Sequence, residues 1–308
     1  MPSSQSTPAQ KSSSEKLHED QESNMSTESS VTCIYQVMLA ACLRNIIITW
    51  SKTSTIHSLT ITVENHSDEN HQTCQIDFQS GQFWSRKGLK SLSVDETDRV
   101  DIFWDFRAVK FSTNPEPCSN YYVAFVFDKQ VVLLLGDSKD EAYKRTMGRP
   151  SQVGPTLLHK EEILYGNNCF YTQVLLGDGP KEHDIVINNP SKMPDEPELK
   201  ISIDGRAVVQ VMNLSWRFRG NETVLVNNVP VQIFWDVHDW LFSSSPGTGH
   251  GLFIFKPESL KNILDDDKSH KGNREKKNRD EDYVTSAVGC CHFVFAVKTQ
   301  GCLKENIT

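Results

Sequence analysis

The chain has 308 residues, of which 37% are hydrophobic and 23% charged, so it can bury the core of one large β domain or of two domains of common size. Its formal net charge of -8 argues against a generic nucleic-acid-binding protein, whose binding surface would be basic. The sequence contains no run of about 18 apolar residues, the length that a membrane-spanning helix needs.

Residues 1–30 are rich in serine, threonine, glutamine and glutamate and contain almost no large apolar side chains. Such a segment cannot offset the entropy cost of ordering, so we expect a disordered tail. The stretch also lacks the apolar core of a signal peptide, and the cysteines show no spacing typical of a metal site. The sequence therefore predicts an intracellular, non-secreted protein of the cytoplasm, with nuclear entry left open, that uses no metal or cofactor.

Residues 31–137 consist of short runs rich in β-branched and aromatic side chains. The runs read TCIYQVML, IIITW, SLTITVE, CQIDF, VDIFW, YVAFVF and VVLLLG. Each has the length of a strand and is bounded by polar or turn-forming residues, which is typical of antiparallel sheets.

The segment 138–167 is expected to connect this β region to a second one. It begins with one short helix over 138–147, where Ser138 and Glu141 have the spacing of a capping box and Gly148 precedes a proline. The run EEILYG then predicts a further strand.

Strand-like runs return over 168–299, and they follow the order of those in 31–137. An insertion rich in charged residues interrupts them, and we expect its part near 265–282 to be disordered because it has few apolar side chains. It includes the basic run REKKNR, a weak nuclear-import signal that neighbouring acidic residues dilute. Residues 300–308 are expected to form a short tail.

Two frames recur in the two β regions. The first is W-x-x-[KR]-G and the second is F-W-D, and they involve Trp84, Lys87, Gly88, Trp104 and Asp105 in the first region and Trp216, Arg219, Gly220, Trp235 and Asp236 in the second. Because the order of elements is kept over about a hundred residues, chance similarity is a poor explanation. The sequence therefore predicts an internal duplication.

The predicted fold is mainly β, with two tandem, pseudo-symmetric antiparallel units over 31–137 and 168–299. Each unit would be a β-sandwich or a flattened barrel. Strand pairing across the two units, which would give one larger continuous sheet system, is the alternative.

The residues of the second frame allow a structural and a chemical interpretation. Period two puts Trp104 and Trp235 on the apolar face of their strands, where each ring would fill the core. Paired carboxylates such as Asp105 and Asp236 can hydrolyse glycosides, but equivalent positions in two units need not converge on one site. We expect ion pairs instead, of Lys87 with Asp105 and of Arg219 with Asp236. No catalytic, cofactor-binding or metal-binding residue is predicted.

His238 is a weak functional candidate together with Asp236, because it follows that carboxylate closely. The first unit has Arg107 at the equivalent place, so the histidine is not part of the shared frame. No G-x-S-x-G turn accompanies it, and a surface histidine is the simpler interpretation.

The segments SVTCIYQVMLA, FWSRKG, VDIFWDFRAVKF, EAYKRT and above all VQIFWDVHDWLF resemble the plant proteins of domain-of-unknown-function family 868. The resemblance covers roughly 30–300 and implies no activity or catalytic residue. The shared aromatic frames favour a non-enzymatic binding or scaffold protein that presents loops or a groove to a protein, glycan or lipid. The alternative is a hydrolase with its site in one unit only. We expect a protein or small-ligand partner, no nucleic acid and no membrane span.

Overall fold

The computed structural model describes residues 28–54, 56–64, 72–78, 86–94, 98–112, 114–177, 181–189, 197–243, 249–258 and 290–299. The tail predicted at 1–30 lies outside them except for residues 28–30, and β1 already begins at Ser29. The insertion near 265–282 and the end at 300–308 lie wholly outside the described residues.

The described part of the chain is mainly β, as the sequence predicts. Its first strands are β1 (Ser29–Leu39), β2 (Cys42–Lys52), β3 (His57–Val63), β4 (Gln72–Asp77), β5 (Lys87–Ser93), β6 (Arg99–Asp105), β7 (Lys110–Phe111), β8 (Pro117–Ser119), β9 (Tyr122–Phe127), β10 (Gln130–Leu135) and β11 (Arg149–Pro150). The later ones are β12 (Thr156–Gly166), β13 (Cys169–Leu175), β14 (Glu182–Asn188), β15 (Leu199–Ile203), β16 (Arg206–Val211), β17 (Arg219–Val226), β18 (Val229–Asp236), β19 (His250–Pro257) and β20 (Cys291–Lys298).

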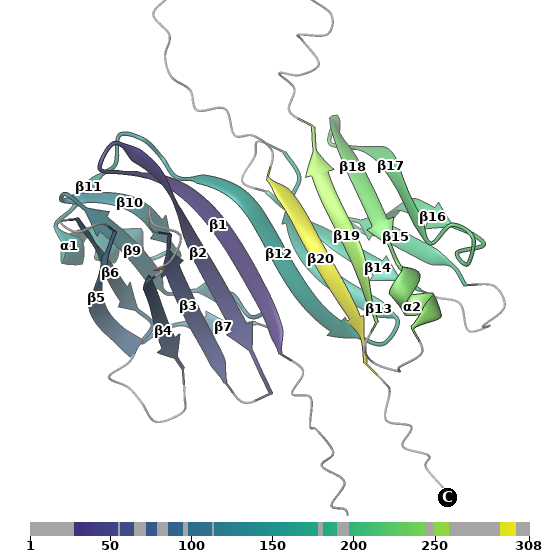
Figure 1. Cartoon of the computed structure of the whole chain (residues 1–308), viewed down its shortest axis with the longest axis horizontal. Coiled ribbons are helices and arrows are strands. Elements are labelled where there is room, and N and C mark those ends of the chain that lie inside the picture. Colours follow the sequence, from purple (N-terminus) through teal and green to yellow (C-terminus); the bar gives the residue numbers. More distant parts are fainter. Residues whose placement is uncertain are drawn as a thin grey trace, which may run out of the picture.

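The described strands form open sheets. A nine-stranded sheet has the order β17-β18-β19-β20-β12-β1-β2-β3-β4, and its two ends face smaller sheets of order β11-β10-β9-β6-β5 and β13-β14-β15-β16 (Figure 1). A two-stranded β7-β8 ribbon completes the set. No sheet closes among the described strands, so the flattened-barrel form predicted from the sequence is wrong.

Strand β12 joins the two ends of the large sheet. It pairs antiparallel with β1 and parallel with β20, and in Figure 1 it lies between the purple β1 and the yellow β20. Pairing therefore runs across the two predicted units, as in the alternative considered from the sequence. The segment expected to be a mere connector supplies the central strand, because both of its edges carry backbone groups that need partners.

Two large apolar cores lie between facing sheets, and a smaller buried cluster includes Ala142 of α1. The N-terminal core contains side chains from β1–β4 and from β5, β6, β9 and β10, whereas the C-terminal core contains side chains from β13–β16 and from β17–β20. Burial alternates along most strands, as at Ile46, Ile48 and Trp50 of β2, because successive side chains point to opposite faces. Leu157 of β12 packs against the N-terminal core and Leu164 against the C-terminal core.

Two short helices accompany the described strands, whereas the sequence predicts one. Helix α1 (Lys139–Thr146) confirms the predicted connecting helix, but Ser138 makes no capping hydrogen bond through its side chain, so the predicted capping box is wrong. Helix α2 (His238–Phe242) was not predicted. Trp240 anchors it by donating a 2.7 Å hydrogen bond from Nε1 to the carbonyl of Ala296 in β20.

Candidate functional site

The repeated frames set a glycine against a tryptophan in both β regions. Gly88 pairs with Trp104 across β5 and β6, and Gly220 pairs with Trp235 across β17 and β18. The tryptophans are buried, with 9% and 5% of their surface exposed. A Cβ atom on Gly88 or Gly220 would lie 2.2 or 2.3 Å, respectively, from the Cζ2 atom of the facing ring. Both rings thus fill core space, and neither offers a face to a ligand.

Both ion pairs expected from the frames are present. Lys87 Nζ lies 3.3 Å from Asp105 Oδ2, and Arg219 Nε lies 2.7 Å from Asp236 Oδ2. Asp105 also contacts a cation that the sequence did not predict, because Arg107 Nη2 lies 2.7 Å from the same oxygen. Burial alone would raise the pKa of Asp105, but hydrogen bonds from Arg107 and Lys87 outweigh it and lower this pKa.

His238 occupies the place that Arg107 has in the first β region. The Oδ1 atom of Asp105 accepts the backbone N–H of Arg107 at 3.2 Å, and the Oδ1 atom of Asp236 accepts that of His238 at 3.1 Å. The imidazole ring packs edge-on against Phe218. Asp236 and His238, the weak functional candidates, therefore close the turn after β18.

The W-x-x-[KR]-G frame also contains a tryptophan in each β region, of which the structure describes the second. Trp84 lies outside the described residues. Trp216 lies between β16 and β17 with 89% of its surface exposed. The frame residues described so far line neither of the two cavities discussed next.

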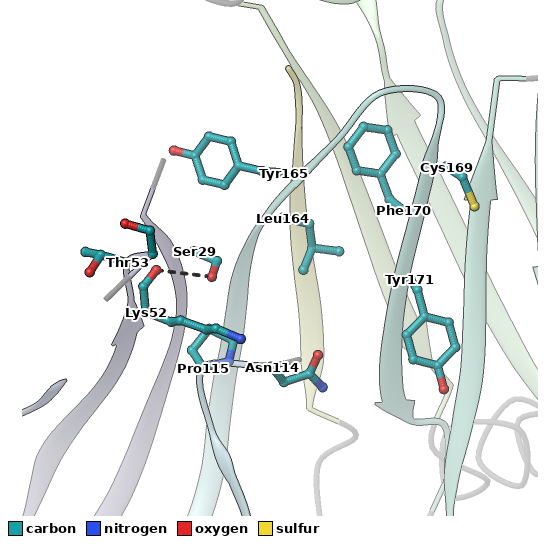
Figure 2. A pocket seen from close by; sticks show the side chains of 11 residues that line it. Ser29, Lys52, Thr53, Asn114, Pro115, Leu164, Tyr165, Cys169, Phe170 and Tyr171 are labelled. Carbon is teal, nitrogen blue, oxygen red and sulfur yellow. Dashed lines mark hydrogen bonds between the residues drawn. The ribbon is translucent and has the colours of Figure 1, made fainter. Parts of the chain in front are cut away.

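A cavity of about 510 Å³ opens between the two cores, beside β12 (Figure 2). Figure 2 shows Lys52 and Ser29 on one side, Phe170 and Tyr171 of β13 on the other, and Leu164 between them. Its complete lining is Ser29, Lys52, Thr53, Ser54, Asn114, Pro115, Leu164, Tyr165, Cys169, Phe170 and Tyr171. Elements of both predicted units thus form its walls.

A second, more polar cavity of about 330 Å³ adjoins the first, because Asn114 lines both. It is lined by Val31, Ser112, Asn114, Glu116, Pro117, Cys118, Lys160, Glu162, Gln173 and Glu182. We call the two cavities together the junction groove. Its floor is the inward face of β1 and β12, one wall is the segment 112–118, and the other wall is β13 with the start of β14.

The polar part of the groove contains a charged cluster centred on β12. Lys160 Nζ lies 3.3 Å from Glu162 Oε1 and 3.8 Å from Glu116 Oε2. The hydroxyl of Thr172 in β13 donates a hydrogen bond to Glu162. His292 Nε2 in β20 lies 3.3 Å from Glu162 Oε1. Glu162 is 5% exposed and therefore links three strands through a buried carboxylate.

Electrostatics fix the charge states of this cluster. Burial opposes the ionisation of Glu162, but contacts with His292, Lys160 and Thr172 outweigh it and lower the pKa of Glu162 to about 2. Burial lowers the pKa of His292 in spite of the adjacent carboxylate. Burial would also lower the pKa of Lys160, but Glu162 and Glu116 outweigh it and raise this pKa. At neutral pH the cluster holds a lysine cation, an ionised Glu162 and a neutral histidine.

The three carboxyl groups of the groove differ in how firmly they are held. Glu162 is held by Lys160, Thr172 and His292, whereas Glu116 on the segment 112–118 and Glu182 at the start of β14 have fewer contacts. Within the described ranges, no group of three or more histidine, cysteine, aspartate or glutamate side chains could hold a metal ion. The sequence places EEILYG in a strand but does not single out Lys160 or Glu162.

None of the helices in the described part of the chain is long and apolar enough to cross a membrane.

Comparison with known proteins gives one result. The family model for plant proteins of unknown function, DUF868, matches residues 26–298. The match covers every described strand and both helices. Neither the curated proteins nor the solved structures gave a match.

Proposed function

Because the chain belongs to the DUF868 family of plant proteins of unknown function, its family supplies no activity, and we propose that it is a non-enzymatic binding protein whose ligand or partner occupies the junction groove. The observation that carries the proposal is the joint construction of the groove. Lys52 and Asn114 reach it from one β region, Phe170 and Tyr171 from the other, and Leu164 from the strand between them.

The dimensions and lining of the groove support binding. Its larger cavity, about 510 Å³, lies within the range of roughly 300–1,000 Å³ that is usual for ligand sites. The aromatic rings of Tyr165 and Tyr171 supply apolar contact area in a cavity that Lys52 also lines. A few polar groups among apolar walls fix the orientation of a bound molecule.

The hydrolase alternative requires a site within one predicted unit only. The polar groups of the groove come instead from the segment 112–118, from β12 and from β13 and β14. Glu162, the most buried carboxylate among them, is committed to internal contacts with Lys160, Thr172 and His292. This arrangement favours binding over the hydrolase.

We further propose that residues 31–137 and 168–299 arose by internal duplication, with 138–167 between them. Equivalent backbone pairings support this proposal, since Lys87 and Gly88 face Asp105 and Trp104 as Arg219 and Gly220 face Asp236 and Trp235. In that interpretation each unit is a β-sandwich, and the groove lies between the copies. We retain from the sequence the expectation of an intracellular location.

A bulky side chain in the groove tests the proposed function. Asn114 lines both cavities, so Asn114→Trp should fill the place where they meet. Asn221→Trp is the matched control, because Asn221 is exposed on β17. We expect native mass spectrometry of the full chain with peptide, glycan and lipid mixtures to find a ligand that binds the native chain and Asn221→Trp.

Asn114→Trp should weaken binding of that ligand by at least about tenfold. Equal binding by both variants would place the ligand outside the groove and overturn the proposal. Conversion of the bound compound into a hydrolysis product would favour the enzyme instead.

A further inference from the structure

Among the strands that the structure describes, β13 forms both a wall of the junction groove and the edge of a sheet. In the sheet order β13-β14-β15-β16, β13 is the first strand, and among the described residues it pairs only with β14. Its residues Cys169, Phe170, Tyr171 and Gln173 all line the groove. An unpaired strand edge displays backbone donors and acceptors that an additional strand can satisfy.

The register identifies the backbone groups that face outward. The N–H of Asn189 donates a 2.8 Å hydrogen bond to the carbonyl of Asn168, immediately before the pair Cys169 and Asn188. Hydrogen-bonded pairs alternate along an antiparallel ladder, so Phe170, Thr172 and Val174 direct their backbone groups to β14. The N–H and C=O groups of Tyr171 and Gln173 consequently point away from β14.

The polar part of the groove beside this edge has three carboxyl groups and one lysine, and Lys52 lines the larger cavity. Glu116, Glu162 and Glu182 line the polar part, where Lys160 is the lining cation among the described residues. Lys160 contacts both Glu116 and Glu162, and burial of Glu116 raises the pKa of its carboxyl although Lys160 opposes this. Glu182, at the start of β14, is exposed. An added cation near Glu116 and Glu182 would favour the ionised form of Glu116 and would pair with the exposed carboxylate of Glu182.

We propose that an extended segment of a partner protein binds in the junction groove by adding a strand to β13, with a lysine or arginine side chain directed to Glu116 and Glu182. The proposal rests on the proposed function and names the partner's chemistry. Backbone hydrogen bonds to Tyr171 and Gln173 supply affinity, and side chains on alternate positions of the segment supply specificity.

A second copy of this chain fits the edge less well than a basic partner. Pairing of β13 with its own copy would bring together two grooves that each carry Glu116, Glu162 and Glu182. Like charges across an interface are unfavourable, and the chain as a whole has a net charge of -8. A basic segment instead gains attraction at the same place.

One substitution pair isolates the backbone contribution. Gln173→Pro removes an N–H that faces the groove and leaves the hydrogen bonds between β13 and β14 intact, because proline is tolerated on an edge strand at such positions. Gln173→Ala is the matched control, since it removes the same side chain and keeps the N–H. Melting temperatures and circular dichroism of both variants establish that they fold.

A second pair isolates the charge contribution. Glu182→Lys reverses a groove carboxylate, and Glu222→Lys reverses an exposed one on β17, outside the groove. The probe is a displayed library of random peptides, selected against the full chain. We expect enriched peptides to carry lysine or arginine among residues of alternating polarity.

The expected affinities of these peptides distinguish the variants. Gln173→Pro and Glu182→Lys should each weaken binding by about tenfold, while Gln173→Ala and Glu222→Lys should stay within about threefold of the native chain. Added salt should weaken binding to the native chain more than to Glu182→Lys.

Three results would overturn the proposal: no enriched peptides, enriched peptides without basic residues, or binding that Gln173→Pro leaves unchanged. If Asn114→Trp abolishes binding of a glycan or lipid while no peptide binds the native chain, strand addition is wrong but the groove remains a binding site. If peptides bind with the expected variant pattern, both proposals stand.

Discussion

At the scale of single residues, two glycines decide where two tryptophans can lie. A Cβ at Gly88 or Gly220 would overlap the ring that faces it across the strand pair. The same glycine therefore permits close backbone pairing and full burial of a large ring. This explains in steric terms why the sequence keeps both members of the frame.

Gly220→Ala should destabilise the protein by about 1–3 kcal/mol, because the ring of Trp235 must shift to admit the methyl group. Gly154→Ala is the control, since a Cβ there would meet nothing within 4 Å. Denaturant unfolding of both variants measures the difference. Equal stability of Gly220→Ala and the native chain would show that the ring yields without cost.

The two aspartates of the frame should differ in their contribution to stability. The side chain of Asp105 is 10% exposed and contacts two cations, whereas that of Asp236 is 36% exposed and contacts Arg219. We expect Asp105→Asn to cost about 1–3 kcal/mol and Asp236→Asn at most about 1 kcal/mol. Melting temperatures check the order, and a larger loss for Asp236→Asn would contradict it.

Compensating charges give a separate check on the second pair. Asp236→Arg alone should lower the melting temperature, and Arg219→Asp in the same chain should recover part of the loss, because the ion pair is restored in reverse. Groove ligands should bind both variants equally, since neither residue lines the groove. Loss of ligand binding in Asp236→Arg would assign that residue a functional role.

The buried cluster on β12 should make stability depend on pH. The pKa of Glu162 falls from 4.5 to about 2 on folding, and the pKa of His292 falls below 6.5. A group whose pKa is lower in the folded chain than in the unfolded chain contributes its full stabilisation at pH values above the unfolded-chain pKa. This stabilisation is lost as the pH falls towards the folded-chain pKa. On acidification the free energy of unfolding should therefore fall below about pH 6.5 because of His292, and further below about pH 4.5 because of Glu162.

His292→Gln should flatten the melting temperature between about pH 7 and pH 5, because glutamine binds no proton in either state. Glu162→Gln removes a carboxylate that raises the pKa of His292, so the slope between about pH 7 and pH 5 should persist or become steeper, while the contribution of Glu162 itself at lower pH is lost. Thermal unfolding followed across the pH range measures both slopes. An unchanged slope in His292→Gln would show that this histidine has the same pKa in the folded and unfolded chains.

At the scale of elements, β12 shows what the sequence could and could not predict. The strand texture of EEILYG and the helix over 138–147 are local patterns, and both elements are present. The parallel pairing of β12 with β20 joins distant segments and leaves no local signal. Lys160, Glu161 and Glu162 form a charged run typical of a solvated strand, yet Lys160 and Glu162 line a groove. For this reason the sequence pattern did not indicate the residues of the candidate site.

Proline distinguishes a central strand from an edge strand. Ile163 pairs with Ser30 on one side and Phe295 on the other, so Ile163→Pro must break a ladder hydrogen bond and should abolish stable folding. Thr223→Pro is the control on edge strand β17. The N–H of Val237 donates to Phe218, so the alternation directs the N–H of Thr223 outward. Thr223→Pro should fold, as solubility and circular dichroism can establish.

At the scale of the whole molecule, two cores share one sheet. The large sheet contributes β1–β4 to the N-terminal core and β17–β20 to the C-terminal core, and β12 is paired with both groups. Loss of either core therefore removes a partner from β12. We expect the described strands to unfold in one cooperative transition.

Phe253→Ala tests this coupling, because Phe253 is fully buried in the C-terminal core and its truncation should cost about 3–5 kcal/mol. Native-state hydrogen exchange should then speed up by the same factor in β2 of the N-terminal core as in β18. Acceleration confined to β18 would mean that the two cores open independently.

The position of β20 also governs how the chain can be made. During translation β12 leaves the ribosome long before its parallel neighbour β20, so one edge of β12 and one edge of β19 must wait unpaired. Unpaired strand edges of this kind can pair with those of another nascent chain on the same polysome. Lys160 and Glu162 put charges on the strand during that interval and discourage this association. We therefore expect variants that replace both charges by apolar residues to aggregate more during synthesis than the native chain.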